Sequence, residues 1–324
     1  MMDLIDILKN KVQEKCPTIV FPEGEDPRIL GAVKRLQDDK VIKPIVLGAT
    51  EAVEKTAKDL NIDLSELNFI DPETSEALNE LKAALLERRK GKLDEAGADK
   101  LIRDVNYFGT MLVYTGKAEG LVSGAVHTTG ETVKPALQII KTKEGFKRTA
   151  GAFIMLRGDE MYLMADCAIN IEHTPESLAE TAVLAGETAK TFDMDPKIAM
   201  LSFSTKGSAS HETVDRVVEA TKLAKAMAPE LKLDGELQFD AAFVPEVAKK
   251  KAPDSDVAGQ ANVFIFPSLE AGNIGYKLAQ RFGGFEAVGP ILMGLNAPVN
   301  DLSRGCVEDE VYSLAIITAA QSLM

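Results

Sequence analysis

Residues 18–47, TIVFPEGEDPRILGAVKRLQDDKVIKPIVL, decide the fold class because they carry a strand, a loop, a helix and a second strand in succession. The β-branched run at 18–21 predicts a strand, and the Pro- and Gly-containing run at 22–27 predicts a loop. Apolar residues at helical spacing predict a helix over 28–37, after which a new strand starts at 44–47. This order is typical of a parallel sheet covered by helices.

The same alternation continues through most of the chain. Residues 120–123 predict a strand that leads through a loop at 124–130 into a helix beginning near Glu131. The next segments predict a hairpin-like run at 152–168, a strand at 198–204 and a helix at 212–227. A strand at 262–266 follows, then a loop at 267–272 with a helix through Arg281. The chain ends with a strand around 290–293, a loop at 294–305 and a closing helix from about Val307. We therefore expect an α/β protein with mainly parallel sheets, in which ligands bind at loops that follow strands.

Length and charge limit the classes of function. The chain has 324 residues, which at about 100–200 residues per domain suggests two domains, with a boundary around residues 141–148. Acidic side chains number 50 against 37 basic ones, a net charge of −13, which argues against nucleic acid or an anionic membrane as a partner. An anionic ligand must therefore be met by a local cluster of cations.

Cysteine and histidine usage argues against disulfides and transition metals. The widely spaced cysteines are Cys16, Cys167 and Cys306, and the histidines are His127, His173 and His211. No pair has the spacing of a zinc site, so we expect reduced thiols and no metal. The chain also lacks a stretch of about 20 apolar residues and a signal-peptide core, which predicts a cytoplasmic protein.

The segment at 296–306, NAPVNDLSRGC, is the strongest candidate for chemistry. Ser303 and Arg304 precede a predicted helix, whose free backbone amides would join them in a phosphate or oxyanion site. The simpler interpretation is that Ser303 is a loop hydrogen-bonder and Arg304 a surface ion. Cys306 has no histidine near it in sequence and is more typical of a small buried residue.

The acidic run at 308–310 begins the closing helix, where carboxylates complement the helix dipole without any catalytic role. One of them is also a candidate general base, because it follows Ser303 within a turn or two. A carboxylate of ordinary pKa near 4 is a weak acceptor for a thiol of pKa near 8.5, a mismatch of about 6 kcal/mol. Burial of the acid or a cation beside the thiol would be needed.

Two other segments are weaker candidates. The loop at 123–130, SGAVHTTG, contains Thr129 and resembles a glycine-lined ligand loop, but it matches neither common phosphate motif, and His127 alone is no evidence for acid–base chemistry. The basic run Arg88-Arg89-Lys90 is more often a solvated helix end. Asn300 is a further binding candidate in the closing segment.

Several motifs together resemble the phosphate acetyltransferase (phosphotransacetylase) family. The resemblance covers nearly the whole chain, with the motifs in the same order: 21–25 FPEGE, 120–125 GLVSGA, 132–138 TVKPALQ, 165–168 ADCA, 201–207 LSFSTKG, 270–281 EAGNIGYKLAQR and 298–306 PVNDLSRGC.

The resemblance implies reversible acetyl transfer between acetyl phosphate and coenzyme A, giving acetyl-CoA and phosphate. It implies no permanently bound cofactor, no metal in the chemical step, and coenzyme A as a substrate. It further implies a homodimer of chains with two three-layer α/β domains and a cleft between them. The first domain would comprise residues 1–143 and 294–324, and the second residues 144–293.

Site residues follow from the resemblance position by position. Ser303 would orient the thiol or stabilise the oxyanion, and Arg304 would hold the phosphoryl group. Arg281 and Lys277 would add cationic contacts to substrate or coenzyme. Lys134 stands where the family commonly has arginine, which keeps the charge but loses bidentate geometry.

The family's aspartate seven residues beyond the motif serine corresponds to Glu310, with Asp309 as the alternative base. The early family arginine corresponds to Arg88 or Arg89, whose register the sequence leaves open. In the implied mechanism the carboxylate accepts the thiol proton in a ternary complex, and the thiolate attacks the acetyl carbonyl directly while phosphate leaves as a good anion. No acyl-enzyme is required.

Three alternatives remain open at this point. Phosphate butyryltransferase performs the same reaction on a longer acyl group, and a non-catalytic module would bind coenzyme A or phosphoesters without turnover. Decarboxylating dehydrogenases share this kind of architecture, but the sequence has no cluster of metal-binding aspartates.

Overall fold

The computed structural model describes residues 4–323. The chain forms two compact units, one of residues 1–143 with 295–324 and one of residues 144–294. Residues 1–3 and 324, which the predicted first domain includes, lie outside the described residues. Each unit contains a sheet with helices packed on it, so the predicted α/β class is confirmed.

The sheet of the first unit is parallel throughout, in the strand order β11-β4-β1-β2-β3. Its strands are β1 (Thr18–Phe21), β2 (Lys43–Leu47), β3 (Asn68–Ile70), β4 (Gly120–Ser123) and β11 (Val299–Asp301). Leu121 of β4 is opposite Val20 on one side and Val299 on the other. The predicted bounds of β1 and β4 are confirmed.

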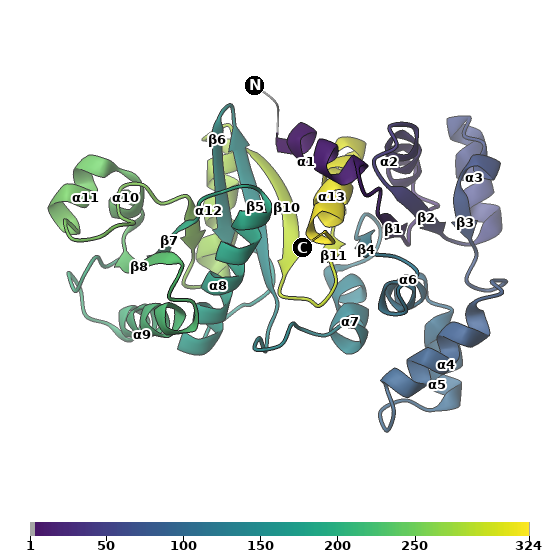
Figure 1. Ribbon diagram of the computed structural model, residues 1–324, viewed down its shortest axis with the longest axis horizontal. Coiled ribbons are helices and arrows are strands. Elements are labelled where there is room, and N and C mark those ends of the chain that lie inside the picture. The colour runs from purple at the N-terminus through teal and green to yellow at the C-terminus, as the bar shows by residue number, and fades with distance from the viewer. Residues whose placement is uncertain (1–3, 324) are drawn as a thin grey trace. The chain divides into compact units, whose positions relative to one another are not determined.

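Helices cover both faces of this sheet. The helices of this unit are α1 (Leu4–Gln13), α2 (Pro27–Asp38), α3 (Thr50–Leu60), the short 3-10 helix η1 (Leu64–Glu66), α4 (Leu78–Arg88), α5 (Glu95–Ile102), α6 (Val105–Tyr114), α7 (Thr129–Ile139) and α13 (Glu308–Gln321). Of these, α4 and α5 pack against each other and against α6. Figure 1 shows α2 and α13 on one side of β1 and β4, and α6 and α7 on the other.

Polar caps fix where the helices beside the strand ends begin. Asp26 accepts a hydrogen bond from Arg28 N at 2.9 Å, and Pro27 occupies the first turn of α2. Thr128 caps α7 in a capping box with Glu131. This box starts α7 at Thr129, two residues earlier than the hydrophobic pattern predicts.

Strand β11 corrects the prediction of one continuous loop over 294–305. Its short sequence, Val-Asn-Asp, lacks the β-branched run that marks the other strands. Pairing with β4 nevertheless fixes it as a strand, with Asn300 opposite Val122 and Asp301 opposite Ser123. Tertiary pairing therefore overrides a weak local preference.

The second unit contains a mixed sheet in the order β10-β5-β6-β9-β7-β8, with antiparallel pairs at β10–β5 and β5–β6. Its strands are β5 (Ala150–Arg157), β6 (Glu160–Ala165), β7 (Lys197–Leu201), β8 (Lys232–Leu237), β9 (Val263–Ile265) and β10 (Glu286–Met293). Its helices are α8 (Pro175–Thr191), α9 (Glu212–Met227), α10 (Phe239–Phe243), α11 (Pro245–Lys251) and α12 (Leu269–Arg281). The predicted hairpin and the predicted bounds of α9 are confirmed.

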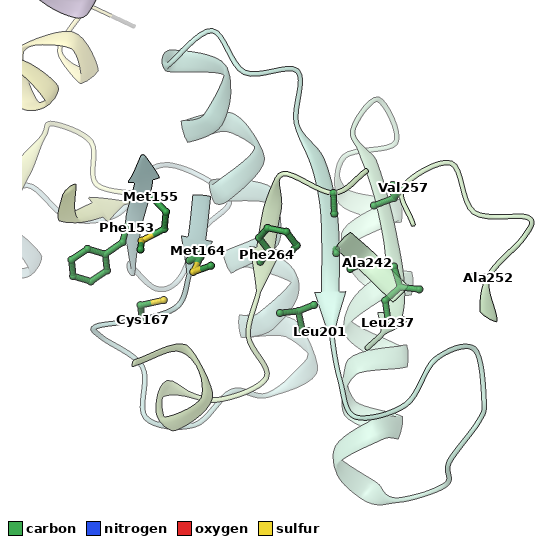
Figure 2. Packing of buried hydrophobic residues seen from close by; sticks show 12 residues of the cluster. Phe153, Met155, Met164, Cys167, Leu201, Leu237, Ala242, Ala252, Val257 and Phe264 are labelled. Atoms are coloured by element: carbon green, nitrogen blue, oxygen red, sulfur yellow. The ribbon is translucent and has the colours of Figure 1, made fainter. Parts of the chain in front are cut away.

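Figure 2 shows part of the core of this second unit, where Phe153, Met164 and Phe264 pack among buried apolar neighbours. Several boundaries differ from prediction, and β10 starts at Glu286, four residues before the strand expected around 290–293. The strand expected at 198–204 ends at Leu201, and α12 begins at Leu269 because Ser268 caps it. Within residues 4–323, no helix has the length and apolar character needed to cross a membrane.

Candidate active site

Three adjacent strands of the first unit end at the same edge of its sheet. Because β11, β4 and β1 are neighbours and parallel, the loops that follow them lie next to one another. These loops comprise residues 22–26, 124–128 and 302–307. The carboxyl edge of a parallel sheet is where α/β proteins bind ligands, so we define this three-loop cluster as the candidate site.

The Glu23 carboxylate holds the loop after β4 through hydrogen bonds to the loop backbone. Its side chain is fully buried. Oε2 accepts hydrogen bonds from the backbone N–H groups of Gly124 (3.1 Å) and Ala125 (2.8 Å). Oε1 accepts from those of Val126 (2.9 Å) and His127 (2.8 Å). One carboxylate from the loop after β1 therefore holds the backbone of the loop after β4.

His127 completes the environment of Glu23, with 2.8 Å between its ring Nδ1 and Glu23 Oε1. The Glu23 hydrogen bond raises the pKa of His127, against the opposite effect of burial. Burial alone would raise the pKa of Glu23, but the hydrogen bonds from His127 and the loop amides lower it. An ionised Glu23 thus faces a histidine that binds its proton more tightly than usual.

Arg28, in the first turn of α2, joins all three loops. Its Nη1 donates to the carbonyl oxygens of Arg304 and Cys306, both at 2.9 Å, and its Nη2 donates to that of Ala125 at 2.8 Å. Asp26 binds the same guanidinium at 2.7 Å and raises its pKa further. The guanidinium fixes the spacing of the loops, and its charge is compensated by Asp26.

Asp301, the last residue of β11, is a second buried acid at this edge of the sheet. Its Oδ2 accepts a hydrogen bond from the Thr129 hydroxyl at 2.6 Å. Burial raises the pKa of Asp301 to about 6, although the Thr129 hydrogen bond opposes the shift. This contact ties the first residue of α7 to the end of β11, so Thr129 has a positioning role here.

Ser303 and Arg304 are exposed on the third loop. Ser303 Oγ accepts a hydrogen bond from the Gly305 backbone N–H at 3.2 Å. Cys306 is buried, and that burial raises the pKa of its thiol to about 11. The protonated, enclosed Cys306 is a packing residue, which leaves Ser303 and Arg304 as the groups available to a ligand.

The acidic residues in the first turn of α13 have two kinds of partner. Glu310 accepts a hydrogen bond from the Val307 backbone N–H at 3.0 Å and so caps the helix. Glu308 and Asp309 each pair with Arg35 of α2 at 2.8 Å. The Asp309 side chain is 81% exposed and is held toward α2, so of the two candidate bases Glu310 is the one without an ion pair to Arg35.

The other predicted site residues of the first unit lie outside the three loops. Asn300 is buried, and its Nδ2 donates to Thr318 at 2.8 Å and Gln321 at 2.6 Å. These contacts give Asn300 a structural role, and its predicted binding role stays a prediction. Arg88 donates to the Ile139 carbonyl at 2.7 Å and stacks on Tyr114.

Arg89 is half-buried at the end of α4, and Lys134 is exposed in α7. Lys277 and Arg281 belong to the second unit, where both are exposed on α12. The structure thus places Ser303 and Arg304 in the three-loop cluster, with Thr129 directly after its middle loop, and places these cations on α4, α7 and α12.

Sequence reasoning missed Glu23, Arg28 and Asp301 as parts of the site. Glu23 stands in the quoted 21–25 motif and Asp301 beside the serine, so position after a predicted strand was the available signal. Arg28 gave no signal, because an arginine in a first helical turn is ordinary. Within residues 4–323 no group of three potential metal ligands comes together.

Comparisons with known proteins agree with this fold and identify the family. Residues 3–319 match the family model described as phosphate acetyl/butaryl transferase. The chain is 61% identical to the phosphate acetyltransferase of Bacillus subtilis (strain 168), with both chains covered in full. The family assignment predicted from the motifs is therefore confirmed: this chain belongs to the phosphate acetyl/butaryl transferase family, and it is an acyltransferase.

Solved structures of phosphotransacetylases are similar to this chain over nearly its whole length. The EutD phosphotransacetylase from Staphylococcus aureus superposes with a TM-score of 0.94 at 58% identity. A phosphotransacetylase from Streptococcus pyogenes gives 0.96 at 56% identity. Each comparison covers 99% of this chain and 98% of the other.

Proposed function

We propose that this chain catalyses reversible transfer of an acetyl group between acetyl phosphate and coenzyme A, giving acetyl-CoA and phosphate. The observation that carries the proposal is full-length identity of 61% to a phosphate acetyltransferase. The three-loop cluster supports it, because Ser303 and Arg304 stand exposed on a rigidly held loop. An exposed guanidinium on a protein of net charge −13 is a suitable local anchor for a phosphoryl group.

The proposed roles follow from this arrangement. Arg304 holds the phosphoryl group, and Ser303 orients the thiol or stabilises the oxyanion. Glu310 accepts the thiol proton, and Asp309 is the less suitable base because Arg35 engages it. The thiolate attacks the acetyl carbonyl in a ternary complex, with no acyl-enzyme.

Further binding roles are proposed for cations that stand outside the cluster. Lys134, Arg88, Arg89, Lys277 and Arg281 are assigned to contacts with substrate or coenzyme, and none of them is assigned to the acyl-transfer step. Coenzyme A acts as a substrate, with no permanently bound cofactor and no metal in the chemical step. The proposed location is the cytoplasm.

We also propose a homodimer, supported by an apolar stripe formed by α12 and the residue that caps its C-terminus. Ile274, Leu278 and Phe282 are spaced by four residues and are 59%, 49% and 89% exposed. A stripe of this kind on one helical face is suited to a second copy of the chain. Leu278→Glu should yield monomers by size-exclusion chromatography with light scattering. Gln280→Glu adds the same charge on α12 and should leave the dimer intact, whereas dimers in both variants would contradict the stripe's role.

Thioester formation from coenzyme A and acyl phosphates, with a metal chelator present, tests the proposed function. We expect acetyl phosphate to react and butyryl phosphate to react much more slowly. Preference for butyryl phosphate would make the chain a phosphate butyryltransferase. Tight coenzyme A binding without thioester would make it a non-catalytic binding module.

The base is tested separately by Glu310→Gln and Asp309→Asn. We expect Glu310→Gln to lower kcat by about 100-fold or more, the usual contribution of general-base catalysis, and Asp309→Asn to leave kcat within a few-fold of wild type. Loss of activity in Asp309→Asn alone would move the role to Asp309. Full activity in both variants would remove general-base catalysis from this helix.

A further inference from the structure

His127 lies at the centre of a segment with one end tied to the Ser303 loop and the other to the last residue of β11, which precedes that loop. On one side, the Ala125 carbonyl shares the Arg28 guanidinium with the Arg304 carbonyl, at 2.8 and 2.9 Å. On the other side, the Thr129 hydroxyl binds Asp301 at 2.6 Å. The residue midway between these tethers is therefore held beside the loop that carries Ser303.

Glu23 fixes how the imidazole is presented. With Nδ1 against the buried Glu23 carboxylate, Nε2 points away from that carboxylate. The His127 side chain is 21% exposed, and within residues 4–323 no hydrogen bond is found at Nε2. A carboxylate that orients one ring nitrogen while the other is left open is the arrangement used for proton transfer.

The charges around His127 favour its protonated form. Glu23 and Glu25 face it from the loop after β1, Asp104 from the start of α6, and Glu131 from α7. Arg304 acts on the same Glu131 from the third loop. The net effect, dominated by the Glu23 hydrogen bond, raises the pKa of His127 and so favours the form that can donate a proton.

We propose that His127 is the catalytic acid that protonates the departing phosphate, and that Glu23 is the positioning residue that orients it. This inference rests on the proposed acetyl transfer and adds two residues to it. When the thiolate sulfur bonds to the carbonyl carbon, the bond from that carbon to the bridging oxygen breaks, and its electron pair goes to the oxygen. Nε2–H then gives its proton to the phosphate.

The proton balance closes over one turnover. Glu310 holds the proton from the thiol, His127 has lost one, and phosphate leaves as the monohydrogen dianion instead of the trianion. Exchange with water returns both side chains to their starting states. In the reverse direction, neutral His127 accepts the proton from attacking phosphate.

The test is kcat against pH for wild type and His127→Gln, with acetyl phosphate and with methyl acetyl phosphate as donors. The methyl ester departs as a dianion without a proton, so it does not need the acid. With acetyl phosphate we expect His127→Gln to lose about 100-fold or more in kcat and to lose the decline of kcat at alkaline pH. With methyl acetyl phosphate the loss in kcat should shrink to less than about tenfold, because this donor does not need a proton from His127.

Glu23→Gln gives a second readout, because removing the charge lowers the pKa of His127. Its alkaline decline should move to lower pH by about one unit or more. His211→Gln, which changes an exposed histidine of the second unit, should retain the wild-type profile. Wild-type kcat in His127→Gln, an unmoved alkaline limb in Glu23→Gln, or an equal loss with both donors would overturn the inference. Absence of thioester with wild type would instead overturn the proposed function on which it rests.

Discussion

Two buried carboxylates, Glu23 in the first unit and Asp166 in the second, each accept hydrogen bonds from several backbone N–H groups. Each follows the end of a strand, and each is fully buried. Glu23 accepts four backbone N–H groups and an imidazole. Asp166 accepts five N–H bonds, from the backbones of Gly151, Ala168, Ile169 and Asn170 and from the Asn170 amide.

The difference is the distance along the chain. The partners of Glu23 lie 101–104 residues away, on the loop after a neighbouring strand. Those of Asp166 lie 2–4 residues away, except Gly151 at 15. A local carboxylate shapes one turn, whereas a long-range carboxylate fixes two loops relative to each other. That is the requirement of a site assembled from several strand ends.

The largest expected effect on the free energy of unfolding is that of Glu23→Ala, which should exceed that of Asp166→Ala. Glu23→Ala leaves four loop amides without their acceptor, at about 1 kcal/mol or more each, so we expect a loss of about 4 kcal/mol or more in the free energy of unfolding. In Asp166→Ala three of the four freed backbone N–H groups belong to one turn within four residues of position 166, and such a turn can rearrange toward water more easily than two loops that meet across about 100 residues, so we expect about 2–3 kcal/mol. Urea denaturation measures both, and a larger loss in Asp166→Ala would contradict the comparison.

Glycines in the two units provide a second contrast. Gly124 has φ +111°, and a Cβ there would lie 2.5 Å from Leu302 N and 2.6 Å from Leu302 O, which are backbone atoms. Gly158, in the β5–β6 turn, has φ +58° with open space around it. We expect Gly124→Ala to cost about 3 kcal/mol or more and Gly158→Ala about 1 kcal/mol. Equal unfolding midpoints would show that the loop after β4 is not tightly enclosed.

Asp301→Asn should stabilise the protein at neutral pH. Burial raises the pKa of Asp301 from 3.8 to about 6, so the folded state binds a proton more tightly than the unfolded state. The ionised acid therefore costs stability above pH 6, by up to about 3 kcal/mol, and this cost disappears below about pH 4. Unfolding at pH 7.5 and pH 4 should show a gain for the variant only at the higher pH. A loss at pH 7.5 would mean that the ionised carboxylate stabilises the loops.

The smallest expected effect belongs to the exposed ion pair of Arg35 with Asp309. Because Asp309 is 81% exposed, Asp309→Asn should change the free energy of unfolding by less than about 1 kcal/mol, and added salt should reduce the difference further. A salt-independent loss well above this value would show that the acidic first turn of α13 has a larger structural role than its exposure indicates.

Much of the fold was predictable because local patterns and tertiary structure agree. The β-branched run of β1 and the apolar spacing of α9 give the observed bounds. β11 was not predictable, since a three-residue strand forms only by pairing with β4. In the site, Ser303 and Arg304 were identifiable from one short segment. Glu23 and His127 were not, because they become partners only after the fold brings positions about 100 residues apart together.

The central claim is that the loop after β11 carries the acyl-transfer chemistry, and steady-state kinetics of Ser303→Ala test it most directly. Removing one hydroxyl that acts on the transition state should lower kcat by about 100-fold or more, while KM for acetyl phosphate and coenzyme A stays within a few-fold of wild type. Equal kcat in wild type and variant would contradict the account and place the chemistry elsewhere in the chain.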